Sequence, residues 1–161
     1  IFSFMITIYT DGSALGNPGS GGYGIVLRFG DKVKEISEGY RNTTNNRMEL
    51  LAIIVALRSL KTNKYPVHIY SDSKYVIGSI TKGWLSGWVK KGFKGKKNVD
   101  LWKQYLEVSK AYNLHFHWVK GHAGNRDNER CDRLAVAKAE NGPHLIDEGF
   151  ENKASDSDLF R

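Results

Sequence analysis

The sequence contains only one cysteine, Cys131, among its 161 residues. A single thiol excludes an internal disulfide framework and any zinc site that is built from several cysteines. Scarce cysteine is typical of proteins in a reducing compartment, so we expect a cytoplasmic protein.

Long apolar runs are also missing. No run approaches the roughly 18 residues of a membrane-spanning helix, so no membrane association is expected. Residues 1–8, IFSFMITI, are apolar, but they lack the basic and small-residue flanks of a signal peptide. We interpret Met5 as the natural start and residues 1–4 as an extension or remnant.

Basic side chains outnumber acidic ones, with 24 Lys and Arg against 17 Asp and Glu and a net charge of +7. The excess lies within residues 1–140, whereas residues 141–161 are acidic and polar. This pattern predicts one polyanion-binding domain over residues 1–140 and a flexible acidic tail over residues 141–161. Charge alone would equally suit a generic basic protein.

The apolar periodicity predicts an α/β fold, a five-stranded mixed sheet with helices on both faces. The expected strands cover residues 6–11, 25–29, 32–40, 67–70 and 114–118, and the expected helices cover residues 45–60, 73–81, 99–112 and 126–140. The second and third strands form a hairpin, and strands reached through helices run parallel to their partners. Asn46 is the expected N-cap of the first helix.

The opening loop, TDGSALGNPGSGGYG at residues 10–24, contains the dinucleotide pattern G-x-G-x-x-G at Gly19, Gly21 and Gly24. That cofactor site needs a helix after the last glycine, but the residues that follow, IVLRF, predict a strand. No nucleotide cofactor is therefore expected. The glycines either shape a bulged hairpin or let the backbone approach a ligand beside Asp11.

Four acids stand near the ends of predicted elements. Asp11 and Asp72 each follow a strand, Glu49 lies early in the first helix, and Asp132 lies in the last helix. Singly, Glu49 could form a capping box with Asn46, and Asp132 could be an ordinary helix-edge acid. Together, the four would need cations, and oxygen ligands favour Mg²⁺ or Mn²⁺. Two such ions can clamp the attacking and leaving oxygens of a phosphodiester displacement.

His122 stands in the loop KGHAG, between the last predicted strand and the last predicted helix. A lone loop histidine is usually solvated surface, but at this place it could move protons at neutral pH.

Residues 82–97, KGWLSGWVKKGFKGKK, combine six lysines with Trp84, Trp88 and Phe93 and contain no acid. A solvated lysine face is one interpretation. The interleaved aromatic residues favour a nucleic-acid surface, because lysines neutralise phosphates while rings pack against sugars or bases.

Five ordered motifs resemble ribonuclease HI of the bacterial type: TDGS…GNPG…GGYG at the start, TTNNRMEL at 43–50, YSDSKYV at 70–76, KNVDLW at 97–102 and WVKGHAGNRDNERCDRLA at 118–135. The resemblance covers about residues 5–140 and implies the RNase H-like fold. It also implies a monomer that cleaves the RNA strand of RNA/DNA hybrids. Two Mg²⁺ ions bound with the substrate, or Mn²⁺ in their place, would give 5′-phosphate and 3′-hydroxyl ends.

The resemblance also implies individual roles. Asp11, Glu49, Asp72 and Asp132 match the family's catalytic, metal-binding carboxylates, and His122 matches its mobile loop histidine. Contacts with the RNA strand are implied for Gly12, Ser13, Asn17, Asn45 and Asn46. Contacts with the DNA strand or the backbone are implied for Arg41, Thr44, Lys74, Trp88, Lys90, Lys91, Phe93 and Lys94. Residues 82–97 resemble the family's basic protrusion, but this protrusion is shorter here. The chain also departs from the family in Lys74, where Gln is common, and in the loop GNRD at 124–127, where family members often have proline.

Two other functions stay open at this point. One is a nuclease or strand-transfer enzyme that acts on duplex DNA, and the other is a hybrid-binding module without catalysis. The loop residues expected to face 2′-hydroxyls argue against the first, and the four intact acids argue against the second.

Overall fold

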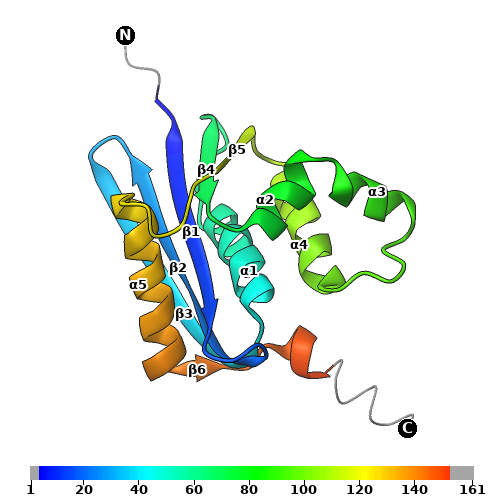
Figure 1. Cartoon of the computed structure of the whole chain (residues 1–161). Coiled ribbons are helices and arrows are strands. Elements are labelled where there is room, and N and C mark those ends of the chain that lie inside the picture. The colour runs from blue at the N-terminus through cyan, green and yellow to red at the C-terminus, as the bar shows by residue number, and fades with distance from the viewer. Residues whose placement is uncertain (1–3, 153–161) are drawn as a thin grey trace, which may run out of the picture.

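A six-stranded mixed sheet forms the centre of the computed structural model, which describes residues 4–152 (Figure 1). The strands are β1 (Ile6–Ala14), β2 (Gly19–Phe29), β3 (Lys32–Thr43), β4 (Val67–Ser71), β5 (Leu114–Trp118) and β6 (His144–Leu145). Their order across the sheet is β5-β4-β1-β2-β3-β6. The predicted α/β fold with a mixed sheet is confirmed. β6 makes six strands where five were expected, because two residues are too short to show a strand pattern.

The strand directions follow the connections. β1, β2 and β3 are antiparallel neighbours joined by short turns, as predicted for the hairpin. β4 runs parallel to β1, and β5 runs parallel to β4, because each is reached through helices. Parallel strands end at the same edge of a sheet, so the residues after β4 lie next to the last part of β1.

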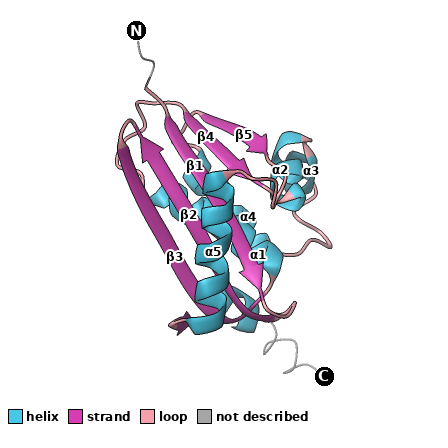
Figure 2. Ribbon diagram, turned by 60° about the vertical axis from the view of Figure 1, so that its left-hand side comes forward, coloured by secondary structure: helices cyan, strands magenta, loops and turns pink. Residues whose placement is uncertain are grey.

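The helices are α1 (Asn45–Arg58), α2 (Lys74–Thr81), α3 (Trp84–Lys90), α4 (Val99–Ser109) and α5 (Arg126–Asn141). α5 lies across β1, β2 and β3 on one face of the sheet, and α1 packs on the other face with α4 against it (Figure 2). α3 was not predicted, since its seven residues WLSGWVK show no regular apolar stripe. It projects from the body in Figure 1.

The core lies between the sheet and α1. The predicted stripe of α1, which includes Leu50, Ile53 and Leu57, is fully buried. The N-cap of α1 is Thr44 and not Asn46, because the Thr44 hydroxyl accepts a hydrogen bond from the backbone N–H of Arg47. α1 therefore begins at Asn45, two residues earlier than a helix capped by Asn46 would.

Glycines in β2 allow α5 to lie directly on the sheet. A Cβ on Gly22 would lie 2.5 Å from the carbonyl oxygen of Ala135, and a Cβ on Gly24 would overlap the carbonyl oxygen of Cys131. The last glycine of the dinucleotide pattern is thus inside a strand. These glycines are close-packing positions for the helix backbone, which the sequence interpretation as a hairpin or ligand loop did not include.

The C-terminal segment folds back onto the domain as far as it is described. β6 pairs with β3, and Asp147 is buried and hydrogen-bonded to Arg47 and Thr43. The structure therefore differs from the expected loose tail over residues 142–152, because burial of this one carboxylate anchors the segment. Residues 153–161 of that tail and residues 1–3 of the expected extension lie outside the described residues. None of the helices within residues 4–152 has the length and apolarity that a membrane crossing needs.

Candidate functional site

Two acids meet where β1 and β4 run side by side. In the parallel register Thr10 pairs with Ser71, and the next residues along the two strands are Asp11 and Asp72. Asp11 is still within β1 and is only 4% exposed, whereas Asp72 follows the end of β4 and is half-buried. The strand register alone therefore brings these two carboxylates together.

Gly12 brings Glu49 to the same place. A Cβ on Gly12 would overlap the backbone nitrogen of Glu49 and lie 2.6 Å from the carbonyl carbon of Met48. The absence of a side chain lets the first turns of α1 contact β1 directly, and Glu49 is buried beside Asp11. A capping box with Asn46 is excluded, because the helix is capped by Thr44 and Glu49 lies in its second turn.

The three carboxylates form a compact cluster. One oxygen from each of Asp11, Glu49 and Asp72 lies within 4.8 Å of the other two. Burial and the neighbouring charges of Asp72 and Asp132 raise the pKa of Asp11 from 3.8 to about 8. Burial and the charge of Asp11 also raise the pKa of Glu49 well above its ordinary value. The cluster is thus unfavourable when it is fully ionised without a cation.

One oxygen of the cluster supports the presence of a cation. Oε2 of Glu49 is buried and has no hydrogen-bond partner among the described residues. Burying an acceptor without a partner costs free energy, and coordination of a metal ion is one way to satisfy such an oxygen. Because the donors are all carboxylate oxygens, the set fits a hard divalent ion such as Mg²⁺ or Mn²⁺.

The fourth predicted acid, Asp132, lies on α5, which covers the other face of β1. It is half-buried and is not part of the three-residue group, although its charge raises the pKa of Asp11. One turn earlier on α5, the side-chain amide of Asn128 donates a hydrogen bond of 3.4 Å to Oδ2 of Asp72. The structure brings three of the four predicted acids into one cluster and places the fourth at its border.

The loop over residues 119–125 contacts the cluster through Gly121, whose Cβ would lie 2.7 Å from Oδ2 of Asp72. The next residue, His122, is exposed and has a left-handed backbone with φ of 54°. Its imidazole makes no hydrogen bond with any residue in the described part of the chain. His122 is therefore one residue from a contact with Asp72, and its side chain is free to turn.

The predicted RNA-contact residues border the N-terminus of α1. Oδ1 of Asn45 accepts a hydrogen bond from the backbone N–H of Ala14, and Oδ1 of Asn17 accepts one from the backbone N–H of Asn45. These bonds fix the loop after β1 against the helix start. Gly12 is buried and Ser13 is half-buried at the end of β1, and Asn46 is exposed on the first turn of α1.

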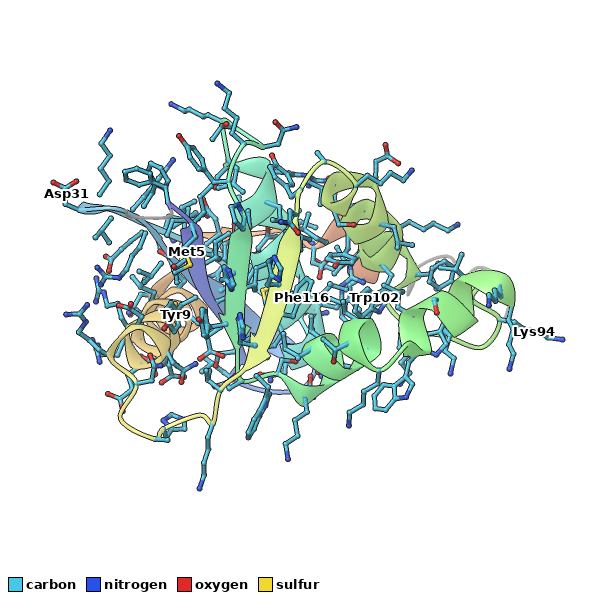
Figure 3. All side chains as sticks on the ribbon, turned by 90° about the horizontal axis from the view of Figure 1, so that it is seen from above. Met5, Tyr9, Asp31, Lys94, Trp102 and Phe116 are labelled. Atoms are coloured by element: carbon cyan, nitrogen blue, oxygen red, sulfur yellow. The ribbon has the colours of Figure 1, made fainter. Side chains whose placement is uncertain are left out.

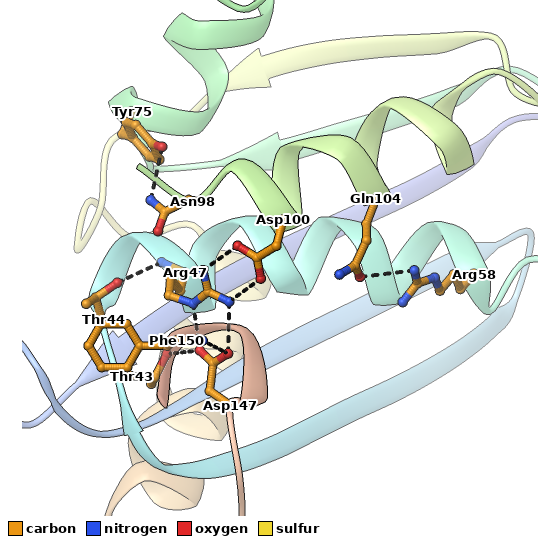
Figure 4. Close-up of polar contacts among 10 residues, drawn as sticks. All are labelled: Thr43, Thr44, Arg47, Arg58, Tyr75, Asn98, Asp100, Gln104, Asp147 and Phe150. Carbon is orange, nitrogen blue, oxygen red and sulfur yellow. Dashed lines mark hydrogen bonds and ion pairs between the residues drawn. The ribbon is translucent and has the colours of Figure 1, made fainter. Parts of the chain in front are cut away.

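A cavity of about 530 Å³ lies beside this helix start and is lined by Asn17, Thr44, Asn46, Lys97 and Asn98, among others. Asn98 was not singled out from the sequence. Its backbone is left-handed with φ of 61°, and its amide donates a hydrogen bond to the hydroxyl of Tyr75 (Figure 4). The KNVDLW motif indicated this segment, but only the fold shows that Asn98 lines the same cavity as Thr44.

Two arginines near this cavity are already paired with acids. Arg41, a predicted DNA contact, forms hydrogen bonds with both carboxylate oxygens of Glu151. Arg47 is buried between Asp100 and Asp147 and bonds both oxygens of each (Figure 4). Sequence reasoning missed the role of Arg47, because its two partners are 53 and 100 residues away.

The basic stretch has a mixed role. Lys90, Lys91 and Lys94 are exposed, and Figure 3 shows Lys94 at the far end of the projection. Trp88 and Phe93, however, are half-buried and pack against the core, with Trp88 edge-to-face on Trp102 at 5.8 Å. Trp88 and Phe93 therefore also pack against the core, which the sequence interpretation as a nucleic-acid surface did not include. Their packing fixes the protrusion onto α4.

Lys74 lies at the start of α2, directly after the loop that carries Asp72. Its ammonium is 5.3 Å from the ring centroid of Trp118. The indole N–H of Trp118 donates a hydrogen bond of 3.1 Å to the backbone carbonyl of Asp72. Trp118 therefore contacts both the Lys74 ammonium and the backbone of Asp72.

Comparisons with known proteins give one consistent family. The profile of the RNase H family matches residues 4–140. A Ribonuclease H from Shewanella sp. (strain MR-4) is 52% identical over 152 residues, covering 91% of this chain and 95% of that protein. A Ribonuclease HI from Synechocystis sp. is 47% identical over 151 residues, covering 90% and 94%. Among solved structures, LC9-RNase H1, described as a type 1 RNase H with the type 2 active-site motif, has a TM-score of 0.78 and 29% identity. That match covers 96% of this chain and 82% of the other.

Proposed function

Because the chain belongs to the RNase H family, we propose that it hydrolyses the RNA strand of RNA/DNA hybrids at the cluster of Asp11, Glu49 and Asp72. The observation that carries the proposal is the buried carboxylate cluster with an unpartnered oxygen on Glu49. A set of oxygen donors that is strained without a cation is the arrangement that metal-dependent phosphodiester hydrolysis needs.

Asp11, Glu49 and Asp72 would hold Mg²⁺, with Asp132 completing the set from α5, and Mn²⁺ would be a substitute. When bound with the substrate, two such ions supply an activated water and stabilise charge on the departing 3′ oxygen. Asn128 would orient Asp72 through its hydrogen bond. His122 would exchange a proton with the departing oxygen, since its loop contacts Asp72 and its imidazole is exposed.

The hybrid would lie across the cluster and the adjoining surface. Gly12, Ser13, Asn17, Asn45 and Asn46 would contact the RNA strand, where 2′-hydroxyls distinguish RNA from DNA. The DNA strand would reach Thr44, Lys74 and the protrusion, with Trp88, Lys90, Lys91, Phe93 and Lys94. Arg41 would contact a DNA phosphate only after it leaves Glu151, so its contribution should be smaller than that of Thr44.

The test is cleavage of a labelled RNA/DNA hybrid with Mg²⁺ by the wild-type chain, by Asp11→Asn and by the control Asp31→Asn. Asp31 is exposed in the turn between β2 and β3 (Figure 3), so its variant should cleave normally. The cleavage rate of Asp11→Asn should be lower than that of the wild type by about a hundred-fold or more. Duplex DNA and duplex RNA should remain uncut, and products should carry 5′-phosphate ends. Undiminished cleavage by Asp11→Asn would exclude this site.

A further inference from the structure

Three of the five histidines in the chain gather on one face of two neighbouring strands. In the parallel register of β4 and β5, His68 pairs with His115, and Tyr70 pairs with His117. Val67 and Ile69 of β4 are buried in the core, so His68 and Tyr70 lie on the opposite face of the sheet. The histidines are therefore not core residues, and the carboxylate cluster does not include them.

This face of β4 and β5 is open. Figure 2 shows α5 in front of β1 and β2, with no helix in front of β4 and β5. β5 is an edge strand of the sheet, at the end opposite β6. His115 is exposed, and His68 and His117 are half-buried. Ions from solvent can therefore reach the imidazoles.

The imidazoles of His68 and His117 are already directed at each other. Nδ1 of His68 lies 2.8 Å from Nε2 of His117, so one ring donates a proton to the lone pair of the other. The ring of His117 also stacks on Tyr70 at 4.6 Å, and the ring of His68 stacks on His115 at 4.7 Å. These stacks hold both rings in place and reduce the entropy lost when they bind a ligand together.

We propose that His68 and His117 form a two-histidine site for a borderline divalent ion such as Zn²⁺. Zinc binds imidazole nitrogen at about 2.0–2.1 Å, so two nitrogens on a tetrahedral ion lie about 3.3 Å apart. The two nitrogens would separate by about half an ångström, and the nearly parallel rings would tilt so that both lone pairs point at the ion, which would replace the shared proton. The donor ring then carries its proton on its other nitrogen, and water completes the coordination.

The chemistry of this site differs from that of the carboxylate cluster. Imidazole nitrogen suits Zn²⁺, Cu²⁺ and Ni²⁺, whereas Mg²⁺ prefers oxygen ligands. Burial and the charges of His115 and His117 lower the pKa of His68, which favours the neutral form that a metal needs. The site goes beyond the proposed hydrolysis, because it would join the edge strand β5 to β4 with an ion that the reaction does not use.

The test is calorimetric titration of Zn²⁺ into the full chain without a histidine tag, in saturating Mg²⁺ to occupy the carboxylates. We expect one Zn²⁺ to bind per chain. Zn²⁺ binding should be lost at about pH 5, because protonated imidazoles cannot bind the ion. His117→Phe keeps a ring against Tyr70 but removes a ligand, so affinity should fall at least about ten-fold. His68→Gln should do the same.

Two control variants define the site. His122→Ala removes a solitary exposed histidine and should leave Zn²⁺ affinity unchanged. His115→Ala removes only the stacking partner of His68 and should weaken binding by less than His117→Phe does. Absence of saturable binding in Mg²⁺, or unchanged binding by both His117→Phe and His68→Gln, would overturn the proposal. A loss in His115→Ala as large as in His117→Phe would overturn the assignment of this pair as the ligands. Circular dichroism of each variant shows that it is folded.

Discussion

Replacing Asp11 with Asn should stabilise the metal-free protein while it removes activity. The folded structure raises the pKa of Asp11 from 3.8 to about 8, chiefly through burial and the charges of Asp72 and Asp132. A carboxyl whose pKa is raised on folding favours the folded state at low pH. That contribution is lost as the pH rises from the unfolded value through the folded one.

The size of the effect follows from the shift. One unit of pKa corresponds to about 1.4 kcal/mol, and pH 7 lies about three units above the unfolded value, which sets an upper limit of about 4 kcal/mol. Coupling with Glu49 and entry of water reduce it, so we expect a gain of about 1–3 kcal/mol at pH 7. Asn fits the site, because its oxygen can still accept the hydrogen bond from the Gly12 N–H and its amide can donate to Glu49.

The assay is urea denaturation of the wild-type chain, Asp11→Asn and Asp31→Asn in EDTA at several pH values. The gain in Asp11→Asn should be near zero below about pH 4 and should grow toward about pH 8. Asp31→Asn should show no such growth, since Asp31 is exposed in a turn. Mg²⁺ should stabilise the wild type more than Asp11→Asn. An Asp11→Asn variant no more stable than the wild type at pH 7, or a gain that does not depend on pH, would refute the reasoning.

Three further predictions concern the support of the site. Asp147→Asn leaves the buried Arg47 with one acidic partner, so urea denaturation should show a loss of about 2–4 kcal/mol. Gly24→Ala forces a Cβ against the α5 backbone and should cost about 1–3 kcal/mol by the same assay. Arg28 lowers the pKa of Asp127, so their pair stabilises the fold above the ordinary carboxyl pKa and is lost as the pH falls through the lowered value. Arg28→Met should therefore lose less stability on acidification than the wild type, as measured by thermal denaturation across the acidic range.

The sequence was sufficient to predict the parts of the fold that depend on local patterns. Leu50, Ile53 and Leu57 repeat at helical spacing, and they are buried in α1 as expected. The hairpin of β2 and β3 and the parallel crossovers also follow from short and long connections. α3 was missed because Leu85 is its only buried residue, so its apolar positions form no regular stripe. β6 was missed because it depends on pairing with a strand far away in the sequence.

The site was predictable in its residue types but not in its supporting contacts. Strand ends indicated Asp11 and Asp72, whereas the position of Glu49 depends on the contact between Gly12 and α1. The network of Arg47 could not be found from spacing, because Asp147 lies 100 residues away and belongs to a segment that looked like a loose tail. Ion pairs between residues so far apart in the sequence depend on the topology of the whole chain, so no local sequence pattern predicts them.

The glycines next to Asp11 explain how acids from two helices, α1 and α5, come close to β1. On one face, Gly12 lets α1 contact β1, which places Glu49 beside Asp11. On the other face, Gly24 pairs with Asp11 across the sheet and lets α5 approach at Cys131, the residue before Asp132. A side chain at either glycine would move one helix away from the sheet and its acid away from Asp11. The glycines of this segment therefore serve close packing of helices on the sheet and not cofactor binding. Their packing brings carboxylates from the two faces of the sheet close to Asp11.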